Sequence, residues 1–339
     1  MPAILHLTNG DSAASGMSAG GIPGEIIPWR DVLHEGPVPS GLSLMELSRT
    51  RAKYLATEGL GDLEAIQKNF DDRDDMLRRY ADFDEVVLWF EWDLYDQLQL
   101  IQILDFFSVT TADERAETET HLSIVSFEGY LGALDPEQFE PFFESRKPLD
   151  QSMIDIGHQG WSAFRSPDPR DLERVALGDT RPLEFLAPTL WRQLEELPSA
   201  SNGLSRSEQQ VLESVAHGPL SFHEIFRNVA NREERIFCGD AIMARYIERM
   251  SLTEIPLIAY ASGDPIDAPR TEEDSRAFRN AEMGLTEAGR EVLACERDWI
   301  EMGGSDRWLG GVHLDGSSAA WRWNPDTRRV IEVNAGASV

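Results

Sequence analysis

Two short segments near the amino terminus carry side chains of the types that perform acid–base chemistry. Residues 5–12 (LHLTNGDS) and residues 28–39 (PWRDVLHEGPVP) each follow a short apolar run. Histidine titrates near neutral pH, and arginine binds carboxylates and phosphates with two parallel hydrogen bonds. Such a set could run general acid–base catalysis or hold an anionic ligand. The predicted catalytic residues here are His6, Asp11, His34 and Glu35, and the predicted ligand-binding residues are Asn9, Gly10, Ser12, Arg30 and Asp31.

A second group of polar residues follows the apolar run VVLWF at residues 86–90, which predicts a buried strand. Glu91 ends this strand and is a further predicted catalytic residue. Asp93, Asp96 and Gln97 stand at positions i, i+3 and i+4 of the next helix and therefore share one face. In an open α/β sheet, ligands bind beyond the carboxyl ends of the strands. We therefore predict that these three residues bind ligand at the same edge as Asp11.

Each of these residues also has a structural interpretation. Asp11 or Ser12 could cap a helix, and for Ser12 the cap is the favoured interpretation. Arg30 and Asp31 could form an ion pair, and Asp93 could cap the helix that contains Asp96. For the whole set we favour a functional site, because structural ion pairs seldom need two histidines as well.

No motif in the sequence identifies a cofactor or a metal ion. The carboxylates together with His6 or His34 could bind a divalent cation, but they follow no ligand-spacing signature. No P-loop occurs, and GMSAGG at residues 16–21 does not match the dinucleotide-binding pattern. Cys238 and Cys295 form no CxxC pair, which favours a reducing compartment over a sulfur-based metal site.

A serine esterase is a minor alternative. The tripeptide GDS at residues 10–12 resembles the nucleophile segment of GDSL-type lipases, and Asp155 and His158 have the DxxH spacing of the other two triad members. Both patterns are short, and the family's other motifs have no counterpart in this sequence.

Alternating strands and helices dominate the first 145 residues. Strands are predicted near residues 4–7, 25–29, 86–90 and 121–127, and helices at 44–55, 63–80, 94–107 and 136–144. This order predicts an α/β domain over residues 1–145, with a mostly parallel, Rossmann-like sheet and helices on both faces.

The remaining sequence predicts two further parts. Residues 146–198 contain short helical patterns broken by prolines at 148, 167, 169, 182 and 188, which indicates a helical connector. In residues 199–339, a capping box at Ser205 to Glu208 starts the first of three helices, and short alternating segments follow them. Three helices followed by a strand pair predict a winged-helix-like α+β module.

The formal net charge of −29 limits the classes of partner. It opposes binding to nucleic-acid backbones, which depends on many Lys and Arg contacts. The predicted third helix of the last module offers only Arg245 and Arg249, so we consider DNA binding unlikely and favour self-association or a protein partner. No targeting segment or membrane span is visible, which favours a cytoplasmic protein.

Four motifs in order, LHLTNGD, PWRDVLHEGPVP, WFEWDLYDQLQL and LGGVHL, resemble a bacterial family defined only as domain of unknown function eighteen thirty-five. The resemblance spans residues 5–314 and implies a cytoplasmic protein, but it implies no activity. In many relatives a histidine stands where this chain has Trp92.

The last motif predicts a docking contact. Gly310 and Gly311 allow another backbone to approach closely. We predict that this turn docks on the amino-terminal domain or on a second subunit, with Trp308 as apolar anchor and His313 as polar contact. An ordinary hairpin with His313 in solvent is the alternative.

The functional hypothesis is therefore a protein that binds or acts on a small anionic metabolite. If it is an enzyme, an acid–base hydrolase or transferase is expected. The alternative is a non-enzymatic regulator that senses a ligand with its first domain and meets DNA or a protein through its last.

Overall fold

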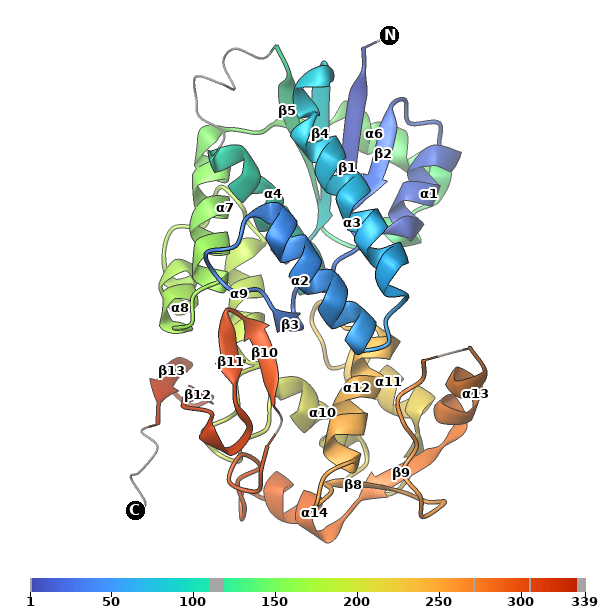
Figure 1. The fold of residues 1–339 in the computed structure, drawn as a ribbon, viewed down its shortest axis with the longest axis vertical. Coiled ribbons are helices and arrows are strands. Elements are labelled where there is room, and N and C mark those ends of the chain that lie inside the picture. The colour runs from blue at the N-terminus through green and yellow to red at the C-terminus, as the bar shows by residue number, and fades with distance from the viewer. Residues whose placement is uncertain (1, 110–118, 271, 305, 334–339) are drawn as a thin grey trace.

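The computed structural model describes residues 2–109, 119–270, 272–304 and 306–333 (Figure 1). Its central sheet has the strand order β2-β1-β4-β5-β6. Strands β1 (Ile4–Thr8), β2 (Glu25–Pro28), β4 (Glu85–Glu91) and β5 (His121–Phe127) run parallel, and β6 (Lys147–Pro148) is antiparallel to β5. The predicted α/β class with a mostly parallel sheet is confirmed.

Helices cover both faces of this sheet. Helices α1 (Asp11–Ala19) and α6 (Phe139–Glu144) share an apolar cluster with Ile4, Val87 and Trp89. Helices α2 (Leu44–Thr57), α3 (Leu63–Arg78), α4 (Leu94–Val109) and α7 (Gln151–Phe164) share another with Leu5 and Leu88. Because alternate residues of a strand face opposite sides, the two clusters lie on opposite faces.

The order of the strands reverses between β1 and β4. The chain leaves β1 through α1 to β2 on one side, then returns through α2 and α3 to β4 on the other side of β1. In open α/β sheets this reversal leaves a crevice beyond the carboxyl ends of the two central strands. Here those ends are Thr8 and Glu91.

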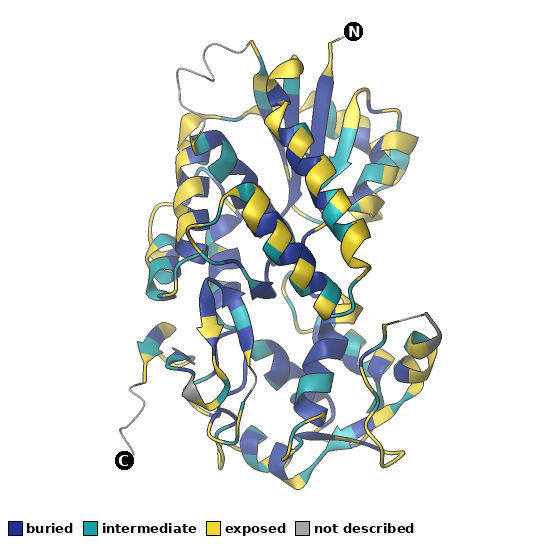
Figure 2. Cartoon of the chain, in the orientation of Figure 1, coloured by how far each residue is buried: buried dark blue, intermediate teal, exposed yellow. Residues whose placement is uncertain are grey.

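Helix α4 is buried on nearly all sides, as its apolar sequence predicts. It packs against α7, β4 and α9 (Leu186–Leu194), which follows α8 (Arg170–Leu177). Figure 2 shows the contrast with α2 and α3, whose outer faces are exposed. The first turn of α4 lies against the end of β4, where Asp96 and Gln97 hydrogen-bond the backbone of Glu91.

The carboxyl-terminal third starts with α10 (Arg206–Ser214), and its predicted capping box between Ser205 and Glu208 is present. Strand β7 (Leu220–Ser221), helices α11 (Phe222–Ala230) and α12 (Asp240–Ser251), and strand β8 (Ile258–Tyr260) come next. Helix α13 (Glu272–Asn280), strand β9 (Glu282–Leu285) and helix α14 (Glu287–Leu293) then follow, and the small sheet has the order β7-β9-β8.

Two hairpins end the chain. One is built from β10 (Arg307–Gly310) and β11 (Val312–Leu314), the other from β12 (Trp321–Asn324) and β13 (Arg329–Glu332). The first hairpin docks on the amino-terminal part, because β10 pairs in parallel with β3 (Gly36–Pro37). The Gly311 amide also donates to the Phe164 carbonyl at 2.9 Å, and a Cβ on Gly311 would lie 2.0 Å from the Arg165 oxygen.

The predicted docking is therefore confirmed for the turn, but the predicted anchors are wrong. Trp308 and His313 stack on each other with ring centroids 4.6 Å apart, and His313 hydrogen-bonds Asp306. The buried apolar side chains of this hairpin are Leu309 and Val312. In a strand, residues two apart share a face, so Leu309 points away from the side on which Trp308 and His313 pair.

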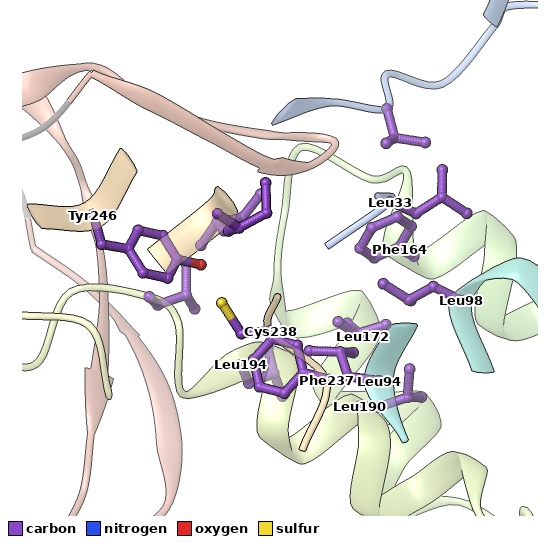
Figure 3. Packing of buried hydrophobic residues seen from close by; sticks show 14 of the residues in the cluster. Leu33, Leu94, Leu98, Phe164, Leu172, Leu190, Leu194, Phe237, Cys238 and Tyr246 are labelled. Carbon is purple, nitrogen blue, oxygen red and sulfur yellow. The ribbon is translucent and has the colours of Figure 1, made fainter. Parts of the chain in front are cut away.

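One apolar cluster extends through the amino-terminal, connecting and carboxyl-terminal parts. Figure 3 shows Leu33, Phe164, Leu194, Phe237 and Tyr246 among its members. None of the described helices combines the length and the apolar character that crossing a bilayer requires.

Candidate functional site

Three carboxyl groups meet where β4 ends and α4 begins. Glu91 is the last residue of β4, and Asp93 and Asp96 lie in the turn and first helical turn that follow. Each offers an oxygen atom within 4.8 Å of the others, and each residue is at most 3% exposed. Their positions are fixed by local bonds, since Asp93 Oδ1 accepts from the Asp96 amide and Asp96 Oδ1 from the Glu91 amide. Asp93 is thus also the predicted helix cap.

Asn9 brings the neighbouring strand into this group. It follows β1, and its Nδ2 donates to Glu91 Oε1 at 3.0 Å and to Asp96 Oδ2 at 2.8 Å. The Leu131 amide donates to the same Glu91 oxygen at 2.6 Å, and Gln97 Nε2 donates to the Glu91 carbonyl. We call Asn9, Glu91, Asp93 and Asp96 the carboxyl site. It lies at the carboxyl ends of β1 and β4, where the strand order reverses.

Burial and mutual repulsion raise the pKa values of these carboxyl groups and so favour their protonated forms. Burial, helped by the charge of Glu91, raises the pKa of Asp93 to about 7. Burial and the charge of Asp93 raise the pKa of Asp96 well above its usual value. Burial also raises the pKa of Glu91, although the Leu131 amide and Asn9 oppose the shift. Groups that hold or release a proton near neutral pH can serve as general acid or base.

The same oxygen atoms are also those that a divalent cation prefers. Glu91, Asp93 and Asp96 could each supply one ligand, and the Asn9 side chain would have to turn its oxygen inward to supply another. A bound cation would displace the protons that the raised pKa values retain.

Asp11 and Arg30 form an exposed ion pair beside this edge of the sheet. Arg30 Nε donates to both Asp11 oxygens, at 2.9 and 3.0 Å, and this bond lowers the pKa of Asp11. Arg30 has φ +37°, which is uncommon for a residue other than glycine and is often found at functional sites. The ion pair between Arg30 and Asp31, which is the alternative interpretation of these two residues in the sequence, does not form.

The expected helix cap at Asp11 or Ser12 is wrong. Gly10 is the N-cap of α1 and no side chain caps the helix; Asp11 is its first residue. Ser12 is exposed beside Gly132.

His6 does not reach the carboxyl site, against its prediction as catalytic. It is fully buried in the face that α1 and α6 cover. Trp89 Nε1 donates to His6 Nδ1 at 3.0 Å, so Nε2 carries the proton and donates to the Pro23 carbonyl. Burial lowers its pKa. The geometry assigns His6 a structural role.

Asp31 and Glu35 also lie away from the carboxyl site, where other side chains form ion pairs and hydrogen bonds with them. Asp31 is buried against Arg51, with a nitrogen to oxygen distance of 2.8 Å. Glu35 accepts from the Tyr246 hydroxyl at 2.7 Å and lies 3.1 Å from Arg307 and 3.3 Å from Arg249. The Asp31 pair holds the loop after β2 against α2, and the contacts of Glu35 tie it to the carboxyl-terminal third, so neither carboxylate belongs to the carboxyl site.

His34 lies in a different environment from the carboxyl site. It is 2% exposed, and burial lowers its pKa to about 4. Its ring meets Phe237 and Tyr95 edge-on, at centroid distances of 5.0 and 6.2 Å. The expected convergence of His6, Asp11, His34 and Glu91 is therefore not observed.

Two residues of the carboxyl-terminal third that the sequence does not predict as part of a site contact Trp92 and Tyr130, and Trp92 lies between Glu91 and Asp93 in the chain. Arg235 Nη1 donates to the Trp92 carbonyl at 3.0 Å, and its guanidinium lies over the Trp92 ring at 4.9 Å. The Ile236 amide donates to the Tyr130 hydroxyl at 2.6 Å. No local pattern marks Arg235, because its partner is 143 positions away.

The serine-esterase triad is not assembled. His158 hydrogen-bonds Asp105 of α4 at 2.6 Å, and Asp155 is bonded by Gln151. Ser12 belongs to α1, on the opposite face of the sheet from α7.

No family model matches the sequence, and no curated protein matches it. The resemblance to the domain of unknown function therefore stays a prediction, and function is argued from the geometry of the carboxyl site.

Proposed function

We propose that the protein binds a small metabolite at the carboxyl site and acts on it by acid–base chemistry. The observation that carries this proposal is the convergence of Glu91, Asp93 and Asp96 with Asn9 at the reversal of the strand order. Buried carboxyl groups with raised pKa values are costly for stability, and such groups cluster at functional sites. Asp93 is the proposed proton donor and acceptor, since its pKa of about 7 suits both roles near neutral pH.

An anionic metabolite needs a cation at this edge of the sheet. Arg30 is the arginine of the predicted set, and Asp11 holds it in two hydrogen bonds. An anion can therefore bind in two ways: Arg30 exchanges Asp11 for the ligand, or a divalent cation bridges the ligand to the carboxylates. Hydrolysis and group transfer both remain within this proposal.

Native mass spectrometry of the purified full-length protein tests the proposal. We expect a bound small molecule or metal ion on the wild-type chain and its loss from Asp93→Asn, which keeps the size of the side chain. Asp105→Asn on the same helix is the matched control, because Asp105 bonds His158 on the surface. Equal occupancy of all three proteins would contradict a ligand at the carboxyl site.

A ligand-sensing regulator is the second candidate, and one segment favours it. Residues 29–39 run from Arg30 beside the carboxyl site to Glu35 and β3, which contact α12 and β10. A ligand that moves Arg30 would therefore pull on the contacts of the carboxyl-terminal third.

We further propose that residues 199–339 form a winged-helix-like module with a protein partner or a second copy as its target. The support is the order α10, β7, α11, α12, β8, α13, β9 at the start of this part, with sheet order β7-β9-β8. DNA binding has little support, because Arg249 bonds Glu35 and buried Arg245 bonds the Pro269 carbonyl. We keep the cytoplasm as the proposed location, supported by the free thiols of Cys238 and Cys295.

A further inference from the structure

A cavity of about 320 Å³ lies where the carboxyl-terminal third meets the connecting helices. Its lining comes mainly from the start of α4, from α9, from residues 233–235 between α11 and α12, and from the turn between β12 and β13. Volumes of this size hold small molecules in proteins. We call it the Arg235 cavity, after one of its lining residues.

Ion pairs within the lining leave an excess of positive charge. The side chains that pair with one another are Arg192, Arg206, Glu195 and Glu233. The other charged residues of the lining are Arg235, Arg328 and exposed Glu234, and in the described part of the chain none of them forms an ion pair. Two unpaired cations therefore accompany one unpaired carboxylate, in a protein whose formal net charge is −29. This balance favours a ligand with one negative charge.

Arg235 is held in place but keeps a free donor. Its Nη1 donates to the Trp92 carbonyl at 3.0 Å, and its guanidinium lies over the rings of Trp92 and Phe185, 4.9 and 5.4 Å from their centroids. Its Nη2 makes no hydrogen bond within the described chain and, unlike Nε, is not buried. A fixed guanidinium with an accessible N–H edge is suited to bind a carboxylate.

Arg328 supplies a second cation from the turn between β12 and β13. It has φ +51°, a left-handed conformation that glycine adopts without strain and other residues do not. Its guanidinium lies over the Trp191 ring, 5.8 Å from the centroid. Strained conformations of this kind cluster at binding sites, so the arginine at this position points to a use for its side chain.

The rest of the lining limits the ligand further. Leu94, Ala187, Pro188 and Trp191 are apolar, so burying an apolar group against them is favourable. A phosphate monoester carries about two negative charges at neutral pH and would meet the three glutamates of the lining. A carboxylate carries one negative charge and matches the excess of one cation.

We propose that the Arg235 cavity binds a small monocarboxylate with an apolar or aromatic body. The carboxylate accepts hydrogen bonds from Arg235, Arg328 adds positive charge, and the body packs against Trp191. This site goes beyond the proposed function, because no residue of the carboxyl site lines it. The two sites are neighbours along the chain, since Leu94 in the lining follows Asp93.

Phenylacetate is a suitable probe, because it joins a single carboxylate to a flat apolar ring. We expect calorimetric titration into the full-length protein to show saturable binding at one site. Phenylacetamide has nearly the same shape without the charge and should bind at least about tenfold more weakly. Phenyl phosphate should also bind more weakly than phenylacetate. The proposal is overturned if phenylacetate shows no saturable binding, or if either analogue binds as tightly.

Two variants test the arginines separately. Arg235→Gln should weaken phenylacetate binding at least about tenfold, and its thermal midpoint reports whether the protein is folded. Arg328→Gln should also weaken binding. Its matched control is Arg329→Gln, which removes the same charge one position later and should bind as the wild type does, because Arg329 is exposed and does not line the cavity. Wild-type affinity in Arg328→Gln, or in folded Arg235→Gln, would refute the proposal.

The carboxyl-site variant separates this proposal from the proposed function. Asp93→Asn should bind phenylacetate as the wild type does, even where it loses the ligand of the carboxyl site. If Asp93→Asn instead lost both, the cavity would belong to the carboxyl site and the proposal of a separate site would be wrong.

Discussion

Two clusters of buried carboxyl groups in this molecule differ in their charge balance. In the described part of the chain, no ion pair joins Glu91, Asp93 or Asp96 to a cation, and their pKa values are raised. The second group, which we call the interface cluster, lies where the amino-terminal and carboxyl-terminal parts meet. Its members are Glu35, Glu196, Glu233, Arg192, Arg249 and Arg307.

In the interface cluster each carboxylate has an arginine. Arg307 lies 3.1 Å from Glu35 and 3.3 Å from Glu196, and Arg192 lies 2.7 Å from Glu196. Burial would raise the pKa of Glu196, but Arg192 and Arg307 outweigh it and lower the pKa to about 2. The comparison shows that burial alone does not mark a site for chemistry. What distinguishes the carboxyl site is burial without a compensating cation.

The largest expected loss of unfolding free energy follows from a substitution in the interface cluster. Arg307→Met leaves Glu35 and Glu196 short of a buried positive charge, and breaking such a pair costs about 3–5 kcal/mol of unfolding free energy. Urea denaturation followed by fluorescence measures the loss. Exposed Arg181, which pairs only locally with Asp179, gives the control Arg181→Met, with an unchanged midpoint. A wild-type midpoint for Arg307→Met would mean that the interface cluster does not hold the two parts together.

The contribution of the carboxyl site to the unfolding free energy should change with pH in the opposite direction from that of a salt bridge. The pKa of Asp93 rises from 3.8 to about 7 on folding, so the folded chain holds the proton more tightly. Stability therefore falls as the pH rises from 3.8 to about 7, and the loss persists above that range. Asp93→Asn removes this loss and should be more stable than wild type by about 2–4 kcal/mol at alkaline pH. Urea titrations across pH test this, and a constant difference between the two proteins would refute the assigned shift.

Glu196 should show the reverse dependence. Its pKa falls from 4.5 to about 2 on folding, so the stability it contributes is present above 4.5 and lost as the pH falls towards 2. Glu196→Gln should therefore cost about 2–3 kcal/mol at neutral pH and progressively less in acid. Urea denaturation of both proteins at decreasing pH measures how the difference between their unfolding free energies narrows. A difference that widens in acid would contradict the lowered pKa of Glu196.

The smallest effect is expected at the exposed pair of Asp11 and Arg30. Its side chains are 69% and 38% exposed, so solvent screens the attraction. Asp11→Asn should change the unfolding free energy by less than about 1 kcal/mol and should lose that difference in high salt. A large loss of unfolding free energy that does not depend on salt would show that this pair stabilises the fold as strongly as the pairs of the interface cluster do.

Much of the carboxyl site could be predicted because it depends on local pattern and topology. Glu91, Asp93 and Asp96 follow one strand and Asn9 follows its neighbour, and parallel strands end at one edge. The neighbours of His6 in the sequence already indicate on which face of the sheet it lies. It stands between Leu5 and Leu7, so it must face the opposite side of a sheet that is covered on both sides.

The partners of Glu35 could not be predicted in the same way. Arg249 lies 214 positions later, and Arg307 later still. A carboxylate next to a histidine is typical of a functional site, so the local sequence predicts that Glu35 belongs to one. Only the folded structure shows the arginines that pair with it. The pairing of β3 with β10 escaped prediction for a related reason, since two residues are too short to leave a strand pattern.

The parallel pairing of β3 with β10 has a consequence for synthesis on the ribosome. Residues 36–37 emerge early, but their partner strand is made only after residue 307. Until then the edge of β3 is open and Glu35 lacks Arg307, so the amino-terminal part cannot complete its packing as it leaves the tunnel. Contacts this distant in sequence slow folding and prolong the exposure of apolar surface. Nascent chains that stop before β10 should therefore be more sensitive to protease at residues 29–39 than the finished protein.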